Sequence, residues 1–413
     1  FRFDLHHRFS DHVKRWWPEK GSVDYYAALA HHDRILRDRR LLTFSDGNAT
    51  FQISSLGFLH YTTVSLGTPS VTFLVALDTG SDLFWVPCDC VQCAPNFELS
   101  IFSPNTSLTS KTVPCNNSLC RNECSGAKSC PYKVAYVSAN TSSSGVLVED
   151  VMYLTAEDEV VDARVIFGCG KVQSGSFLDV AAPNGLFGLG MEKISVPSIL
   201  SAAGLTADSF SMCFGNDTIG RIIFGDKGSP DQEETPFNHR RTYNISVTGL
   251  HVGTSIDTNF SALFDSGTSF TYLAEPVYTR LSEGFNSQVR DKRNSRIPFE
   301  FCYFISSIEN TSLIPSISLT MKGGGQFSVV DPIIIISTEK EFGYCLAVVK
   351  STNLNIIGQN FMTGQRIVFD REKLVLGWKK FDCDVEDSNT LPINPRNHPP
   401  TVSVVPGSYN PEA

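Results

Sequence analysis

The sequence has few charged residues and no long apolar run. Asp, Glu, Lys and Arg make up 19% of its 413 residues, the net charge is −9, and no domain-sized stretch is basic. Proteins that bind nucleic acids need clustered Lys and Arg to neutralise phosphates, so we expect no nucleic-acid partner. The longest uncharged apolar run, around Ile333–Ile336, is far shorter than the roughly 20 residues of a membrane-spanning helix.

Long stretches with helical periodicity are also scarce. Short apolar runs rich in Val, Ile, Phe and Thr alternate with Gly and Pro, which is typical of strands joined by turns. With 41% apolar residues and a length too great for one ordinary domain, the chain can bury two cores. We therefore expect an all-β protein of two lobes.

Cysteine is abundant, but the His ligands that often accompany it in zinc sites do not follow closely. Cys88, Cys90 and Cys93 contain a single CxxC pattern, and four more cysteines lie within Cys115–Cys130. A structural zinc site usually carries paired CxxC motifs or His in register. Zinc is the alternative, but disulfides are the better interpretation, and we expect neither a metal nor a cofactor.

The order of the twelve cysteines suggests a pairing. Nesting favours Cys115–Cys130 around Cys120–Cys124, with Cys90–Cys93 beside them and Cys302–Cys345 in the second half. Elimination leaves Cys88–Cys169 and Cys213–Cys383.

Eight Asn-x-Ser/Thr sequons accompany these cysteines. Together they favour the secretory pathway and a protein outside the cell or at its surface, because thiols are oxidised and glycans are added on that route. The sequons begin at Asn48, Asn105, Asn116, Asn140, Asn216, Asn244, Asn259 and Asn310.

Two short motifs, one in each half, carry the candidate chemistry. Asp78-Thr79-Gly80-Ser81 follows the apolar run Val71–Leu77, and Asp265-Ser266-Gly267-Thr268 follows Ser261–Phe264. One such motif can arise by chance at the end of a strand, whereas two in matching contexts are far rarer. We interpret Asp78 and Asp265 as a catalytic pair.

The residue types in these motifs suit amide hydrolysis without a covalent intermediate. Two carboxyl groups a few ångströms apart hold one proton between them, so the pair supplies both a base for water and an acid for the carbonyl. Gly80 and Gly267 permit a tight turn and offer N–H donors to the carboxylates. The hydroxyls of Ser81 and Thr268 can donate to the outer carboxylate oxygens.

Residues 1–57 differ from the rest of the chain. Phe1–Leu5 is predicted as a strand and Asp24–Arg40 as a helix ending in a basic cluster, and the segment has nine Lys and Arg against seven Asp and Glu. Such a leader suits a pro-segment lying over an acidic cleft. A solvated amphipathic helix is an equally weighted alternative. Since neither Met nor a signal-peptide pattern opens the sequence, we expect it to be trimmed from a longer precursor.

We expect four segments along the chain. They are a pro-segment at 1–57, an N-terminal lobe at 58–236 with the first Asp, a C-terminal lobe at 237–383 with the second, and a Pro-rich stalk at 384–413. If a longer precursor adds small residues, a spacer and an apolar tail, the protein would carry a GPI anchor and attach to the plasma membrane.

Beyond the two motifs, the chain resembles the pepsin family of aspartic proteases, in particular the cysteine-rich plant group similar to nepenthesins, without a saposin-like insert. Asn184–Gly190 and Asn355–Gly358 match the family's two apolar-apolar-Gly segments. The resemblance implies a bilobal fold with a central cleft, in which Thr79 and Ser266 brace the catalytic loops against each other. It also implies that Trp85 supports a flap tyrosine, which is Tyr136.

The flap is where the sequence departs from the family. The usual Tyr-Gly-x-Gly-Ser is replaced by Tyr136-Val-Ser-Ala-Asn140, and the next glycine is Gly145, which we expect to open the return strand. Side chains in place of glycines restrict the backbone, so we expect a stiffer flap. A glycan on Asn140 would obstruct the cleft, and an unmodified, solvent-facing Asn140 is the alternative.

The resemblance implies a monomeric aspartic endopeptidase that cleaves polypeptides at acidic pH, with apolar or aromatic residues beside the cut bond. One alternative is a non-catalytic protein on the same fold, similar to plant inhibitors of microbial xylanases. Another is a cell-surface binding protein. The two intact motifs favour the enzyme.

Overall fold

The computed structural model describes residues 60–380 apart from short gaps, and three short strands nearer the N-terminus. The gaps are 95–99, 122–123, 125–127, 137–139, 157–158, 179–181, 183, 215–218, 296–298, 306–313 and 338–341. Several predictions fall outside the described residues, namely the helix at Asp24–Arg40, the sequons at Asn48, Asn216 and Asn310, Cys383, and the tail 384–413.

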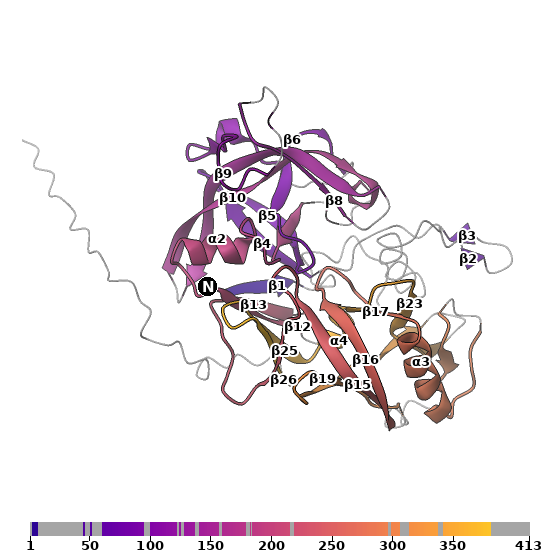
Figure 1. Cartoon of the computed structure of the whole chain (residues 1–413). Helices are drawn as coiled ribbons and strands as arrows, with labels where there is room; N and C mark the ends of the chain where they lie inside the picture. The colour runs from indigo at the N-terminus through magenta and orange to yellow at the C-terminus, as the bar shows by residue number, and fades with distance from the viewer. Residues whose placement is uncertain are drawn as a thin grey trace, which may run out of the picture.

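Strands dominate the fold, as the sequence predicts, and they gather in two lobes (Figure 1). The first lobe contains the strand pair that leads to Asp78 and a long antiparallel hairpin. Its elements are β4 (Tyr61–Leu66), β5 (Val71–Asp78), β6 (Trp85–Gln92), β7 (Lys111–Thr112), β8 (Pro131–Ala135), β9 (Ser142–Ala156), β10 (Glu159–Ser174), β11 (Leu186–Gly188) and α2 (Val196–Ala202), with short 3-10 turns at Pro104–Thr106 and Gly175–Phe177.

The second lobe repeats the pattern around Asp265. A seven-stranded sheet in the order β20-β19-β15-β16-β24-β17-β23 carries α3 on one side. The elements are β15 (Asn244–Val252), β16 (Thr254–Phe264), β17 (Thr271–Ala274), α3 (Val277–Gln288), β18 (Cys302–Phe304), β19 (Ile317–Met321), β20 (Gln326–Val329), β21 (Ile333–Ser337), β22 (Phe342–Leu346), β23 (Val348–Ser351), β24 (Ile356–Ile357) and α4 (Gln359–Met362).

A continuous sheet joins the two lobes. The strand β12 (Ser209–Phe214) pairs with β13 (Ile219–Phe224) on one side and with β25 (Gln365–Asp370) on the other. β25 pairs in turn with β26 (Val375–Lys380), and β26 pairs with β14 (Glu233–Pro236). On the other side β13 pairs with β1 (Arg2–His6), and β1 pairs with β4 of the first lobe. The strand predicted at Phe1–Leu5 is thus confirmed and occupies the middle of this sheet. A further hairpin pairs β2 (Phe44–Ser45) with β3 (Thr50–Phe51).

The two apolar-apolar-Gly segments occupy equivalent places. β11 runs parallel to β5, so that Gly188 stands opposite Asp78. In the second lobe β24 runs parallel to β16, so that Ile357 stands opposite Phe264, the residue before the second aspartate. Each segment thereby fixes the end of the strand that leads to an aspartate.

Most of the buried side chains in both lobes are apolar. A main cluster of buried side chains extends from the first lobe to the second, and a smaller one centred on Trp85 and Phe177 lies beside the flap. Burying such side chains contributes roughly 1.5–3 kcal/mol each relative to exposure. Within the described residues, no helix is long and apolar enough to cross a bilayer.

Three of the predicted disulfides are formed, and the cysteines within Cys115–Cys130 are paired differently from the prediction. Cys88–Cys169, Cys90–Cys93 and Cys302–Cys345 are formed, and Cys213 is also disulfide-bonded. The nested pairing of Cys115–Cys130 around Cys120–Cys124 is wrong, because the bonds are Cys115–Cys124 and Cys120–Cys130.

Local backbone geometry explains this difference. Two consecutive turns, in which Asn117 donates to Pro114 O and Cys120 donates to Asn117 O, bend the chain back at Cys120. The Cα atoms of Cys120 and Cys130 then lie 5.7 Å apart, a spacing that suits a disulfide. Order along the chain carries no information about such turns.

We expect the disulfides of the first lobe to differ in their contribution to stability. Replacing Cys88 and Cys169 by Ala opens a loop with a sequence separation of 81 and should lower the free energy of unfolding by about 4 kcal/mol. The matched double substitution at Cys90 and Cys93, whose separation is 3, should cost about 2 kcal/mol. Denaturant unfolding measures both, and equal losses would contradict the loop-entropy explanation.

Candidate active site

The two aspartates lie at equivalent positions of the two lobes and face each other. Asp78 is the last residue of β5, and Asp265 directly follows β16. Asp78 is 8% exposed. A Cβ atom at Gly267 would stand 2.4 Å from Asp78 Oδ1 and 3.2 Å from Asp265 Oδ1, so the two carboxyl groups are close neighbours. The pair predicted from the sequence is therefore brought together.

Each carboxylate is held by two donors from its own motif. Gly80 N–H donates to Asp78 Oδ1 at 2.9 Å, and Ser81 Oγ donates to Oδ2 at 2.5 Å. In the second motif Gly267 N–H donates to Asp265 Oδ1 at 2.9 Å and Thr268 Oγ1 donates to Oδ2 at 2.7 Å. These bonds fix both carboxyl planes and favour ionisation, which opposes the effect of burial.

The two loops are also bonded to each other. Thr79 N–H donates to Ser266 Oγ at 3.1 Å, and Ser266 N–H donates to Thr79 Oγ1 at 2.9 Å. The same hydroxyls then donate across the lobe boundary, from Thr79 to Phe264 O and from Ser266 to Leu77 O. Both side chains are buried, so water cannot replace these bonds.

Glycine is required in both motifs because each one lies against the carboxylate of the other lobe. A Cβ atom at Gly267 would stand 2.4 Å from Asp78 Oδ1, and one at Gly80 would stand 2.8 Å from Asp265 Oδ1. Any larger residue would therefore separate the two carboxyl groups.

Burial raises the pKa of the Asp78 carboxyl well above its ordinary value, and the neighbouring Asp265 carboxyl raises it further. The hydrogen bonds from Ser81 and Gly80 lower it but do not outweigh these effects. Two carboxylates in contact cannot both ionise at low cost, so the pair keeps one proton over a broad range of acidic pH.

The flap tyrosine lies next to this pair. Trp85 Nε1 donates to the hydroxyl of Tyr136 at 2.9 Å, and Trp85 and Ser81 are among the groups that lower the pKa of that hydroxyl. The ring of Tyr136 meets Phe177 edge-on at 5.0 Å, and Phe177 meets Trp85 in the same way at 4.9 Å. Burial and the Asp78 charge raise the pKa of Tyr136, so its hydroxyl stays neutral.

The hairpin that carries Tyr136 differs from the prediction at its return strand. Tyr136 N–H donates to Thr141 O, and Asn140 is exposed in the turn with φ of 58°. The return strand β9 begins at Ser142, so Gly145 lies within it rather than at its start. A Cβ at Gly145 would stand 1.9 Å from Cys169 O, which explains that glycine by close packing.

Five of the sequons lie in the described part of the chain. Asn105, Asn116, Asn140 and Asn259 are exposed. Asn244 is half-buried at the start of β15, and its Oδ1 accepts a hydrogen bond from Asn238. Asn244 is therefore the least suited of the five to carry a glycan.

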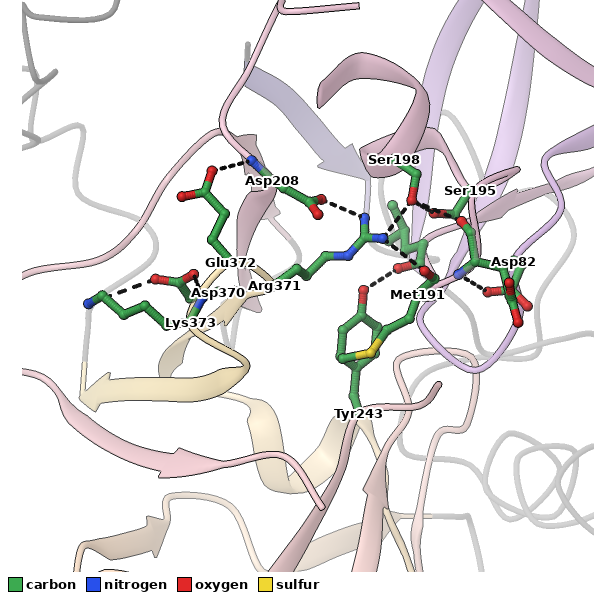
Figure 2. Close-up of polar contacts among 12 residues, drawn as sticks. Asp82, Met191, Ser195, Ser198, Asp208, Tyr243, Asp370, Arg371, Glu372 and Lys373 are labelled. Carbon is green, nitrogen blue, oxygen red and sulfur yellow. Dashed lines mark hydrogen bonds and ion pairs between the residues drawn. The ribbon is translucent and has the colours of Figure 1, made fainter. Parts of the chain in front are cut away.

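Several residues around the pair escaped the sequence reasoning. Asp82 follows the first motif directly and accepts a hydrogen bond from Glu192 N–H at 2.9 Å. Tyr243 and Arg371 contact the chain that supports this loop (Figure 2). Phe177 packs on the flap tyrosine. Only Asp82 carried a signal, its place beside the motif, since the other contacts connect residues far apart in the chain.

Among the described residues, no group of three or more His, Cys, Asp and Glu side chains is placed to hold a metal ion.

Comparison with known families covers most of the chain. Residues 60–226 match the family described as the xylanase inhibitor N-terminal domain, and residues 242–380 match its C-terminal counterpart. Aspartyl protease family protein 1 of Arabidopsis thaliana is 52% identical, over 100% of this chain and 87% of its own length. Aspartic proteinase nepenthesin-2 of Nepenthes gracilis is 26% identical, over 78% of this chain and 77% of its own length.

Solved structures show the same architecture. Basic 7S globulin from soybean superposes with a TM-score of 0.63 at 21% identity, over 79% of this chain and 94% of its own. The protein edgp superposes with a TM-score of 0.64 at 22% identity, over 78% of this chain and 91% of its own. With these matches and its two aspartate motifs, the chain belongs to the pepsin-like aspartyl proteases, in the plant group that includes the nepenthesins.

Proposed function

We propose that the protein is an aspartic endopeptidase that hydrolyses peptide bonds in acid. The observation that carries the proposal is the close approach of the carboxyl groups of Asp78 and Asp265, each held by its own pair of donors. A pair arranged in this way holds one proton and thus contains an acid and a base at once.

Each of the two steps moves one proton onto the pair and another proton off it. The ionised carboxyl of the pair takes a proton from water, whose oxygen attacks the scissile carbonyl carbon, while the protonated carboxyl donates to the carbonyl oxygen. In the second step the ionised carboxyl takes a proton from a hydroxyl of the tetrahedral intermediate. The other carboxyl protonates the nitrogen, the C–N bond breaks, and the pair again holds one proton.

The substrate is proposed to be an extended polypeptide with apolar or aromatic side chains beside the cut bond. Support comes from Tyr136, which is part-exposed next to the pair and whose ring packs on the buried Phe177. The hydroxyl of Tyr136 lies between Trp85 and Ser81, so it is placed to order the flap over a bound chain.

A non-catalytic inhibitor is the second candidate, and the description of the matching family domains favours it. An inhibitor would have no need for a proton-sharing pair. Incubation of the protein with an unfolded polypeptide between about pH 3 and 6 distinguishes the two, because only the enzyme would release fragments.

We also propose that residues 1–57 act as a pro-segment of a secreted enzyme. The strand β1 supports this, since it fills the position between β13 and β4 in the sheet that joins the lobes. The disulfides support passage through an oxidising compartment.

Asp78→Asn and Asp265→Asn should each lower the rate of cleavage by about 10³-fold or more, because either change removes the shared proton. The rate is measured on a peptide substrate at the pH optimum. Asp257→Asn, at an exposed position of β16, is the matched control and should leave the rate unchanged. A variant of either paired aspartate with near-normal cleavage would contradict the mechanism.

Asp78→Asn should also change how stability depends on pH. The folded pKa of Asp78 lies above 3.8, the ordinary value of an aspartate. Its contribution to stability is therefore full below that ordinary value and is lost as pH rises through the folded pKa. Asn carries no such cost, and the variant should gain about 2–4 kcal/mol relative to the natural protein between pH 4 and pH 7. The free energy of unfolding of both proteins, measured with a chemical denaturant at about pH 4 and about pH 7, gives this gain.

The control for this effect is Asp231→Asn. Lys379 lowers the pKa of Asp231, which lies at the surface, so its removal should bring no gain as pH rises. A similar gain in both variants would show that general charge repulsion, not the buried pair, is responsible.

Removal of residues 1–57 should release activity. The full chain should be inactive near neutral pH and should cut itself between Arg40 and Phe58 in acid, as carboxylates of the cleft become protonated. Initial rates are compared for the full chain and a chain starting at Phe58, before any processing. Equal rates would show that the leader does not inhibit.

A further inference from the structure

We propose that Tyr243 and Arg371 are positioning residues for the first catalytic aspartate, and that they act by holding residues 189–192, named here the support segment. The inference rests on the proposed endopeptidase function. Both side chains come from the C-terminal half of the chain, whereas Asp78 belongs to the N-terminal lobe.

The support segment is bonded to the Asp78 loop along its whole length. Leu189 N–H donates to Asp78 O at 2.9 Å, and Gly190 N–H donates to Ser81 O at 2.8 Å. Glu192 N–H donates to Asp82 Oδ1 at 2.9 Å. A Cβ atom at Gly190 would stand 2.2 Å from Asp82 Oδ1, so segment and loop are in direct contact and must move together.

Tyr243 holds the support segment from the other side. It lies just before β15, its side chain is fully buried, and its hydroxyl donates to Leu189 O at 2.6 Å. The N–H of the same residue, Leu189, donates to Asp78 O. One residue therefore links the hydroxyl of Tyr243 to the backbone of the catalytic aspartate.

Arg371 holds the other end of the segment (Figure 2). It follows β25, and its Nη2 donates to Met191 O at 3.2 Å and to Ser198 Oγ at 2.6 Å. The hydroxyl of Ser198 in turn donates to Glu192 O at 2.9 Å. Nη1 lies 3.1 Å from Asp208 Oδ1, which places the two charges in an ion pair without the geometry of a hydrogen bond.

The charge of Arg371 also reaches the loop. Burial raises the pKa of Asp82, and the Arg371 guanidinium is among the groups that lower it. A buried cation is costly unless it is paired and hydrogen-bonded. The guanidinium of Arg371 has two acceptors, Met191 O and Ser198 Oγ, and lies beside the carboxylate of Asp208. Such an arrangement is expected of a side chain that holds the support segment in place.

The second aspartate lacks such a cationic brace in the hydrogen bonds of its equivalent segment. Gln359 N–H and Asn360 N–H donate to Thr268 O and Ser269 O. The side chain of Asn360 donates to Ala347 O at 2.7 Å. One side chain of the first lobe also reaches this segment, since Gln359 Nε2 lies 3.2 Å from His60 Nε2. The two loops therefore differ in the chemical kind of their brace: the hydrogen bonds to the Asp78 support segment include an Arg side chain, and those to the equivalent segment of Asp265 in the described residues do not.

The test compares Tyr243→Phe and Arg371→Lys with Arg366→Lys. Arg366 is the matched control because it lies in β25, the strand that Arg371 directly follows, and forms an ion pair with Asp226, both side chains being 10% exposed. None of its hydrogen bonds or ion pairs in the described residues goes to the support segment. The measurements are kcat and KM on a peptide substrate, and amide hydrogen exchange of residues 76–83 and 186–194.

We expect Tyr243→Phe to lower kcat by about tenfold with KM changed less than twofold, because a small displacement of a catalytic group costs rate rather than affinity. Exchange at Leu189, Gly190 and Glu192 should accelerate by about fivefold. Arg371→Lys should act in the same direction. Arg366→Lys should lower the unfolding midpoint without either effect.

The results decide whether Tyr243 and Arg371 position the catalytic aspartate. Faster exchange with unchanged kcat in Tyr243→Phe would overturn the proposal, and so would an equal fall of kcat in Arg366→Lys. If the natural protein cleaves nothing, the endopeptidase function fails. The exchange measurements still decide the brace in that case: acceleration confined to Tyr243→Phe and Arg371→Lys supports it, and its absence overturns it.

Discussion

Two carboxyl groups that lie side by side inside a folded protein repel each other when both are charged. The residues around Asp78 and Asp265 keep the two groups together despite this repulsion. Glycines allow the close approach, since a side chain at either one would collide with the opposite carboxylate. Donors from Gly80, Ser81 and their counterparts keep one charge stable. The crossed bonds between Thr79 and Ser266 prevent the loops from relaxing apart.

Several sets of contacts hold these loops in place. The farther a set lies from the carboxyl groups, the farther its residues are from the aspartates in the sequence. The first set comes from within each motif, and the second from β11 and β24, which lie beside the strands leading to the aspartates. Beyond these, the support segment is held by side chains from the other half of the chain. The sheet through β12, β13 and β25 keeps those halves in register.

The strands leading to both aspartates were predictable because an apolar run ending at a polar residue is a local signal. The same holds for β1 and for the disulfide between Cys90 and Cys93. Where the outcome depended on turns, as at Cys120, the order of cysteines misled. Arg371 and Met191 are 180 residues apart, so nothing in the neighbourhood of either one in the sequence indicates their contact.

The crossed bonds between Thr79 and Ser266 have a consequence for the order of events during folding. Each hydroxyl closes the loop of the opposite lobe, so neither loop can reach its final form while the other lobe is unfolded. A lone carboxyl in a half-folded chain keeps the acidity of an ordinary aspartate and shares no proton. On the proposed endopeptidase function, a copy with only one folded lobe would therefore cleave nothing.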